Sequence, residues 1–129
     1  MNPTPFLFST QIPAGFPSVA EDSWKEPLDL HRYLIAHPSA TFFLKVCGHS
    51  MTGAGIFDQD IVIVDRSLTP ANGKIIIASL NGELTIKQLK IENGKTFLAP
   101  QNPSYPCLEI SSESDFRVWG VVTFVLHKV

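Results

Sequence analysis

The sequence predicts a mainly β protein: a compact β barrel or sandwich of about seven strands, with an extended N-terminal arm and one short helix. From residue 41 onward, short runs rich in β-branched and aromatic residues alternate with turn residues. Two of these turns are Asn-Gly pairs, at residues 81–82 and 93–94, which favour two-residue hairpins. Helical spacing is confined to a single short segment, so strands must supply the core.

The expected strands follow one another closely along the chain. The run at 61–64, Ile-Val-Ile-Val, is apolar on both faces, so we expect a strand buried between layers. The short helix is expected within 29–36, where Asp29 can cap it, and Pro38 should end it. The seven strands are expected at 41–46, 60–65, 74–80, 83–91, 95–99, 107–110 and 117–126.

The first 28 residues differ from the rest of the chain. They hold five of the ten prolines and show neither helical nor strand periodicity, so we expect an extended arm. At 129 residues, the chain supports one domain with a sizeable core. We therefore divide it into an arm at 1–28 and a β-rich domain at 29–129.

Composition excludes several classes of protein. Hydrophobic residues make up 44% and charged residues 17%, which is typical of a globular chain. The net charge of −2 gives no basic surface, so we expect no direct sequence-specific DNA binding. No apolar run is long enough for a membrane span, and residues 1–10 lack the basic residues of a secretory signal.

The cysteine and metal-ligand patterns of the sequence match no known type of metal or cofactor site. Cys47 and Cys107 do not make a disulfide framework, and we expect two reduced thiols in or near the core of a cytoplasmic protein. The chain shows neither a His/Cys cluster with zinc spacing nor a glycine-rich phosphate loop. We therefore expect no metal and no cofactor.

The candidate chemistry lies in Ser50 and Lys87, which are 37 positions apart (87 minus 50). Ser50 follows a predicted strand in the segment Gly48-His49-Ser50-Met51, where glycine permits a tight turn. A serine hydroxyl becomes a good nucleophile when a base removes its proton. The tetrapeptide alone is short and common, and by itself it is more typical of an ordinary serine that caps a helix.

Lys87 can serve as that base only if its amine is neutral. In a strand it shares one face with Thr85 and Leu89, and apolar residues flank it along the chain. Lowering its pKa from about 10.4 to about 7 requires roughly 4 kcal/mol, which burial can supply. The alternative is a lysine whose amine reaches water. The four histidines have no aspartate at motif spacing, so none is a better base.

Seven segments together resemble the LexA/UmuD family of self-cleaving serine-lysine peptidases, most closely its UmuD-like members. They run in the family's order, and the ordered combination is specific although no single segment is. The segments are Gly15-Phe16-Pro17-Ser18, His37-Pro38-Ser39-Ala40-Thr41, Gly48-His49-Ser50-Met51, Asp60-Ile61-Val62-Ile63-Val64-Asp65, Leu84-Thr85-Ile86-Lys87-Gln88-Leu89, Pro100-Gln101-Asn102-Pro103-Ser104-Tyr105 and Gly120-Val121-Val122.

The resemblance implies a role for each candidate residue. Ser50 would be the nucleophile and Lys87 the general base, and the backbone N–H groups of Ser50 and His49 would hold the oxyanion. The substrate would be the chain's own Ala14–Gly15 bond, where small residues allow an extended strand to enter a narrow cleft.

The resemblance also implies a biological setting. UmuD-like proteins are processed when a RecA–single-stranded DNA filament signals DNA damage in the SOS response. The shortened product, here residues 15–129, would form a homodimer. This dimer would join an error-prone DNA polymerase subunit of the UmuC type in translesion synthesis.

Two other functions remain open at this stage. One is a LexA-type or phage-repressor-type transcriptional regulator, which needs a DNA-binding module before the cleavage site. Only 14 residues precede Gly15, so we expect this function to be absent. The other is a non-enzymatic β interaction module.

The chain also departs from the family pattern in its turns and surface charge, at Ala14, His49, Gln59 and Lys74.

Overall fold

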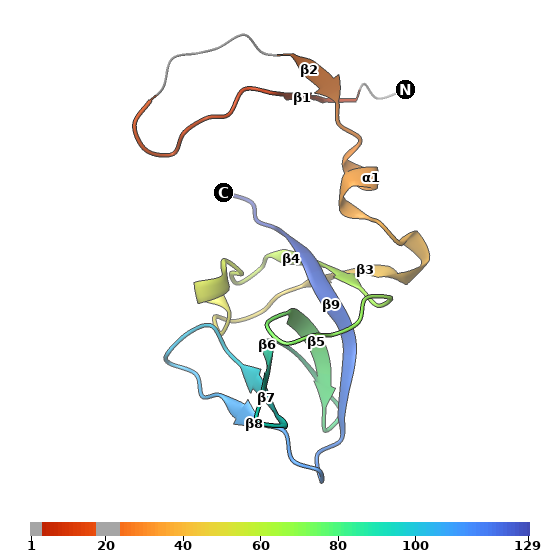
Figure 1. Ribbon diagram of the computed structural model, residues 1–129, viewed down its shortest axis with the longest axis vertical. Coiled ribbons are helices and arrows are strands. Elements are labelled where there is room, and N and C mark those ends of the chain that lie inside the picture. Colours follow the sequence, from red (N-terminus) through yellow and green to blue (C-terminus); the bar gives the residue numbers. More distant parts are fainter. Residues whose placement is uncertain (1–3, 18–23) are drawn as a thin grey trace. The chain divides into compact units, whose positions relative to one another are not determined.

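The computed structural model describes residues 4–17 and 24–129, and its internal contacts divide the chain into two units. The first is Met1–Ala36 and the second is His37–Val129 (Figure 1). The sequence-based division at residue 28 puts the short helix with the second unit, whereas the contacts put it with the first.

The first unit contains a two-stranded antiparallel ribbon and one helix. Strand β1 (Phe6–Phe8) pairs with β2 (Lys25–Pro27), so the prediction of an arm without strands is wrong here. Helix α1 (Leu30–Leu34) begins after Asp29, whose carboxylate accepts a hydrogen bond from the Arg32 N–H at 3.3 Å. The predicted cap is therefore confirmed.

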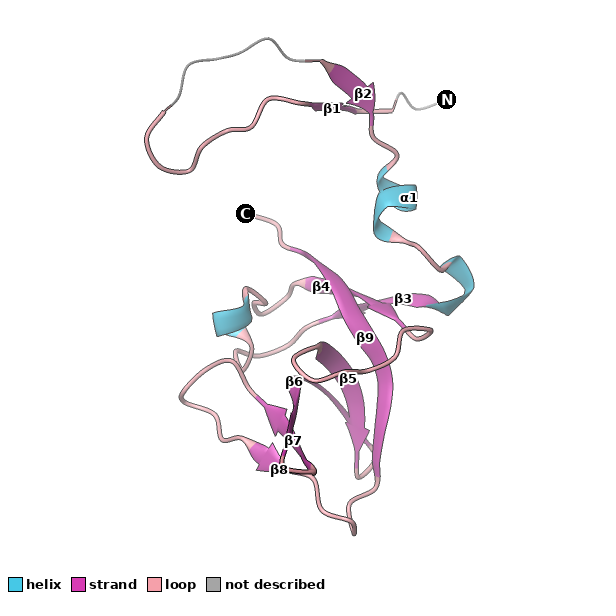
Figure 2. Cartoon of the chain, in the orientation of Figure 1, coloured by secondary structure: helices cyan, strands magenta, loops and turns pink. Residues whose placement is uncertain are grey.

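The second unit is a seven-stranded antiparallel sheet, shown in magenta in Figure 2. Each end of every predicted strand lies within one residue of the observed end, so the mainly β prediction is confirmed. Single 3₁₀ turns cover Pro38–Ala40 and Thr52–Ala54. The strand order is β3-β4-β9-β5-β6-β7-β8. The strands are β3 (Thr41–Lys45), β4 (Ile61–Asp65), β5 (Ile75–Leu80), β6 (Glu83–Glu92), β7 (Lys95–Ala99), β8 (Leu108–Glu109) and β9 (Phe116–Leu126).

Both Asn-Gly pairs form the predicted hairpins, one on each side of β6. Asn81 and Gly82 have φ values of 51° and 86°, and Asn93 and Gly94 have 51° and 76°. Two successive positive φ values are the geometry of a tight hairpin turn. These turns fix the register of β6 against β5 and β7, and the register decides which residues of β6 face the core.

The core lies on both faces of the central strands. Ile76 and Ile77 are neighbours in β5, but they belong to different buried clusters because successive side chains of a strand point to opposite faces. Val62, Ile63 and Val64 of β4 are fully buried, which confirms the predicted burial on both faces. The first cluster holds Val46, Met51, Ile56, Val62, Val64 and Ile77, and the second holds Ile76, Ala78, Leu89, Leu98 and Val121.

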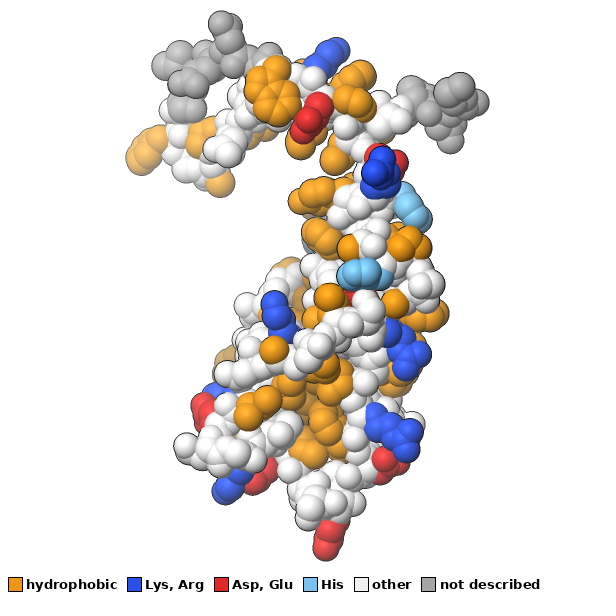
Figure 3. Space-filling view, turned by 45° about the vertical axis from the view of Figure 1, so that its right-hand side comes forward, with side chains coloured by type: hydrophobic (Ala, Val, Ile, Leu, Met, Phe, Trp, Pro, Cys, Tyr) orange, Lys and Arg blue, Asp and Glu red, His pale blue; other side chains and the backbone are white. Residues whose placement is uncertain are grey.

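Both cysteines are exposed and free, so the prediction that they lie in or near the core is wrong. Val46 takes the core position beside Cys47, and the alternation of side chains turns the thiol outward. Hydrophobic side chains also gather on the outside of the second unit, with charged side chains around them (Figure 3). Over the described part of the chain, helices are too short and too polar to cross a membrane.

At Gly120 of β9, a side chain of the neighbouring strand leaves no room for a Cβ. A Cβ there would lie 2.5 Å from Val64 Cγ1, a methyl group that a branched side chain cannot move away. We predict that Gly120→Ala lowers the free energy of unfolding by about 1–3 kcal/mol in urea titrations. In a Val64→Ala background the same substitution should cost less. An equal cost in both backgrounds would show that the Val64 contact is not the cause.

Candidate active site

The loop that carries Ser50 is fixed at both ends. Gly48 has a φ of +99°, which side-chain-bearing residues rarely adopt, and its N–H donates to the Asp58 carboxylate at 2.8 Å. Directly after Ser50, the Met51 side chain is 1% exposed in the first core cluster. Ser50 therefore sits where a strand leads into a single 3₁₀ turn, as the sequence predicts, with its neighbours holding its backbone in place.

The structure brings Lys87 of β6 to Ser50. The Lys87 Nζ atom lies 3.0 Å from Ser50 Oγ, 3.0 Å from Thr85 Oγ1 and 3.0 Å from the Ile86 carbonyl oxygen. Lys87 is half-buried and pairs in register with Ile76, which is fully buried. The two side chains that the sequence singled out are thus in direct contact.

The surroundings of Lys87 favour a neutral amine. Burial lowers the pKa of the Lys87 ammonium from its ordinary value. None of its three oxygen partners carries a charge, and no ion pair to Lys87 occurs among the residues that the structure describes. A neutral amine has two N–H groups and one lone pair. The three oxygen atoms can each accept a hydrogen bond from a charged amine, and when the amine is neutral its lone pair can instead face the Ser50 hydroxyl while its two N–H groups donate to Thr85 and Ile86.

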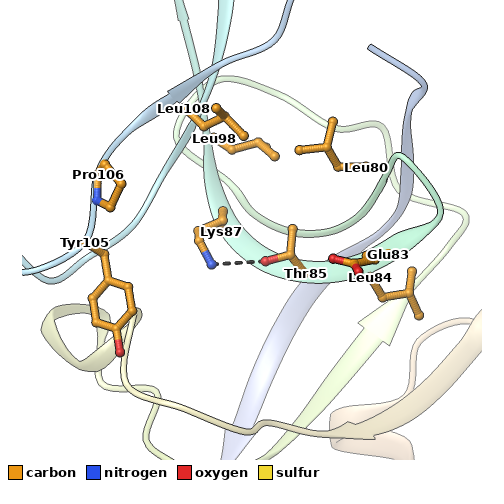
Figure 4. A pocket seen from close by; sticks show the side chains of 9 residues that line it. All are labelled: Leu80, Glu83, Leu84, Thr85, Lys87, Leu98, Tyr105, Pro106 and Leu108. Atoms are coloured by element: carbon orange, nitrogen blue, oxygen red, sulfur yellow. Dashed lines mark hydrogen bonds between the residues drawn. The ribbon is translucent and has the colours of Figure 1, made fainter.

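Two pockets lie on either side of Lys87. One, of about 400 Å³, has a mostly apolar wall that includes Leu98, Pro106 and Leu108 (Figure 4). In this view the Lys87 amine points toward Thr85, to which a dashed line joins it. The other, of about 300 Å³, is lined by Ser50 and by the end of β3. Lys87 and Thr85 line both pockets, and Ser50 lines the smaller one.

Several polar contacts around the site were not found by sequence reasoning. Thr85 was recognised as a neighbour of Lys87 on one strand face but not as its hydrogen-bond partner. Gln101 and Asn102 were quoted only as part of a motif, yet both hydrogen-bond to the backbone of the Ser50 loop. The two-residue spacing of Thr85 and Lys87 was the available signal, because residues i and i+2 share a strand face.

Two histidines have aspartate partners that motif spacing did not reveal. His37 Nδ1 lies 2.6 Å from Asp65 Oδ2, and His127 Nδ1 lies 2.5 Å from Asp60 Oδ1. Both carboxyls are buried, which raises their pKa. Hydrogen bonds outweigh the effect of burial and hold the pKa of each carboxyl below its usual range. Asp65 receives them from Ser67 and His37, and Asp60 receives them from Phe57 and His127. Neither histidine is bonded to Ser50, whose side-chain partner is Lys87.

The expected oxyanion donors are the backbone N–H groups of Ser50 itself and of His49. The backbone N–H groups of His49 and Ser50 have no acceptor among residues 4–17 and 24–129. Their carbonyl groups are held instead, since the His49 oxygen accepts from Asn102 and the Ser50 oxygen accepts from the Gln101 N–H. The two N–H groups are therefore available to a ligand.

The expected cleavage site lies in the first unit. Ala14 and Gly15 are exposed in an irregular segment, and a Cβ built on Gly15 would meet nothing within 4 Å. The flanking apolar residues Ile12 and Phe16 are 91% and 92% exposed. The bond is thus open to solvent.

In the described segments, no group of three or more His, Cys, Asp or Glu side chains is placed to hold a metal ion.

Comparison with known proteins decides the family. The model of the peptidase S24-like family matches residues 5–123. The chain belongs to the peptidase S24-like family. This membership and the identities below confirm the resemblance to the UmuD-like proteins, and they support a self-cleaving serine peptidase.

The relatives differ in how completely they are matched. SamA of Salmonella typhimurium is 42% identical, over 95% of this chain and 84% of its own length. MucA of Escherichia coli is also 42% identical, over 93% of this chain and 82% of its own. LexA repressor 2 of Pseudomonas putida is 36% identical, over 92% of this chain but 58% of its own length.

The buried amine should couple protein stability to pH. Because the pKa of Lys87 is lowered in the folded chain, the unfolded chain binds more protons between that pKa and about 10.4, and stability rises with pH there. In a Ser50→Ala background, we predict that Lys87→Met is stabilising at neutral pH and that its advantage shrinks across this window. Urea titrations at several pH values measure it.

Lys90→Met is the matched control, because Lys90 lies on the same strand with its amine exposed and paired with Glu92. This substitution should show no such trend. A Lys87→Met effect that stays constant with pH would contradict the assignment of a neutral amine.

Proposed function

We propose that the chain is a serine endopeptidase that cleaves its own Ala14–Gly15 bond, with Ser50 as nucleophile and Lys87 as general base. One observation carries the proposal: the Lys87 amine lies 3.0 Å from Ser50 Oγ in a half-buried site where its partners are uncharged. A base within hydrogen-bond reach of the proton that it removes is the basic requirement of this chemistry.

The first half of the reaction forms an ester. Neutral Lys87 takes the hydroxyl proton as Ser50 Oγ attacks the Ala14 carbonyl carbon. The resulting oxyanion accepts hydrogen bonds from the backbone N–H groups of Ser50 and His49. The intermediate collapses when the C–N bond to Gly15 breaks, and the Lys87 ammonium gives its proton to the departing amine. Ala14 is then esterified to Ser50.

The second half restores the enzyme. Lys87, neutral again, takes a proton from a water molecule that attacks the ester carbonyl. Collapse of this second intermediate releases the Ala14 carboxylate and returns the proton to Ser50 Oγ. The products are residues 1–14 and residues 15–129. Thr85 and the Ile86 carbonyl keep the amine aimed at Ser50 throughout, because they occupy its two N–H groups.

The setting follows from the UmuD-like character of the chain, which acts in SOS mutagenesis. Cleavage would be stimulated in the cytoplasm by a RecA–single-stranded DNA filament after DNA damage. Residues 15–129 would form a homodimer and join an error-prone polymerase subunit of the UmuC type. Exposed hydrophobic side chains on the second unit, such as Phe42 and Phe43, support self-association. The net charge of −2 supports contact with DNA through partners.

A repressor function is less favoured. SamA and MucA are 42% identical to the chain, whereas LexA repressor 2 is 36% identical. A non-enzymatic module is also less favoured, because burial lowers the pKa of Lys87 and no ion pair to it occurs among the described residues, which is a costly arrangement for a lysine with a purely structural role.

Alkaline incubation should reveal the activity without any partner. Because burial lowers the pKa of Lys87, raising the pH increases the neutral fraction and should speed cleavage until that pKa is passed. We expect mass spectrometry of the purified chain to show fragments 1–14 and 15–129. An unchanged full-length mass after days at high pH would contradict the proposal.

Substitutions identify the groups. Ser50→Ala and Lys87→Ala should each reduce the cleavage rate by at least about a thousandfold while the chain stays folded. Lys90→Ala, on the same strand, should cleave as the unmodified chain does. If Lys87→Ala cleaves with an unchanged pH profile, another group is the base.

A further inference from the structure

The loop between β7 and β8 is bonded to the loop that carries Ser50. We call residues 100–105 the clamp loop. The Gln101 N–H donates to the Ser50 carbonyl at 2.7 Å, and the Gly53 N–H donates back to the Gln101 carbonyl at 2.6 Å. A Cβ on Gly53 would lie 2.5 Å from the Gln101 oxygen, so only glycine allows this approach. The clamp loop therefore holds the backbone at Ser50 and three residues after it, at Gly53.

Asn102 extends this contact to the preceding residue. Its Nδ2 group donates to the His49 carbonyl oxygen at 2.8 Å and lies 3.4 Å from Thr52 Oγ1. Its Oδ1 atom accepts from the Ser104 N–H at 3.0 Å. Since a backbone N–H can only donate, the oxygen must face Ser104, and the N–H₂ group must therefore face His49. The orientation of the Asn102 amide is fixed from both ends.

Peptide geometry carries this contact to the reaction centre. The His49 carbonyl and the Ser50 N–H belong to one planar trans peptide, in which they point in opposite directions. The described residues contain no cis peptide bond. When Asn102 holds the His49 oxygen toward the clamp loop, the Ser50 N–H must point away from that loop. This N–H has no acceptor within the described part of the chain.

We propose that Asn102 is a positioning residue for the oxyanion. It sets the plane of the His49–Ser50 peptide and thereby aims the Ser50 N–H at the oxygen of the tetrahedral intermediate. The inference rests on the proposed self-cleavage and adds a residue that acts through His49 rather than by touching the substrate. Preorganised donors matter most in the transition state, where the negative charge develops.

Two substitutions separate the two ends of the Asn102 amide. Asn102→Asp keeps the oxygen that accepts from Ser104 and loses the donor to His49. Asn102→Ala loses both. Asn72 provides the matched controls, because its Oδ1 accepts from the Ile91 N–H at 2.8 Å and its bonds do not involve Ser50 or Lys87. Asn72→Asp and Asn72→Ala therefore report the cost of loosening a loop elsewhere.

The first readout is the rate of self-cleavage against pH, measured where urea titrations show each variant to be folded. Both Asn102 variants should lower the plateau rate by about 10- to 100-fold, somewhat less than removal of an oxyanion donor itself. In Asn102→Ala the midpoint of the profile should not move, because the three partners of Lys87 are untouched and no charge is added. The Asn72 variants should match the unmodified chain.

Three results would overturn the proposal: an unmodified rate in Asn102→Asp, an equal loss in the Asn72 controls, or a shifted midpoint with an unchanged plateau.

The second readout, the ¹H–¹⁵N resonance of the Ser50 amide, needs no turnover. It should move in Asn102→Asp and stay in place in Asn72→Asp. If the unmodified chain does not cleave, the proposed function fails, and an unmoved Ser50 resonance separately rejects the positioning of this peptide by Asn102.

Discussion

Lys87 meets Ser50 in a half-buried site where its amine has three oxygen partners and, among residues 4–17 and 24–129, no carboxylate partner. An exposed lysine is almost entirely charged at neutral pH, and a charged amine cannot accept a proton. Burial lowers the pKa of Lys87, and the absence of a negative partner leaves nothing to restore it. The folded chain must supply the cost of holding this amine away from water, and the packing of the central strands supplies it.

Register is what delivers Lys87 to this position. Side chains alternate along β6, so a slip of one residue would move Lys87 to the opposite face and bring Gln88 to Ser50. The Asn-Gly turns at both ends of β6 prevent the slip, and Ile76 opposite Lys87 is buried in the second core cluster. On the other side, the buried Met51 side chain anchors the Ser50 loop in the first cluster. One core cluster therefore fixes the strand that carries Lys87, and the other fixes the loop that carries Ser50.

Local patterns and long-range contacts divide what the sequence could predict. The seven strands were predictable because alternation and turn residues act over a few positions. The β1–β2 ribbon was missed because each strand has three residues and its partner lies about twenty positions away. The exposure of Cys47 was missed because composition does not tell which face of the chain turns inward at that point.

The candidate site was also predictable from local patterns but not from long-range contacts. The residue types and the motif order pointed to Ser50 and Lys87, but the partners that orient them leave no local trace. The bond from Asn102 to His49 spans 53 positions, and that from His127 to Asp60 spans 67. Such bonds depend on how loops meet across the folded sheet. Thr85 was the exception within reach, since it shares a strand face with Lys87 two positions away.

The most direct test of this account is an NMR titration of the Lys87 side chain. The ¹³Cε resonances of a lysine-labelled Ser50→Ala chain, assigned by loss of one signal in Lys87→Arg, follow each amine from neutral to alkaline pH. The account predicts that Lys87 titrates below the ordinary lysine value of about 10.4, because burial lowers its pKa. A Lys87 midpoint at or above that value would show a charged amine at neutral pH and would contradict its role as the base.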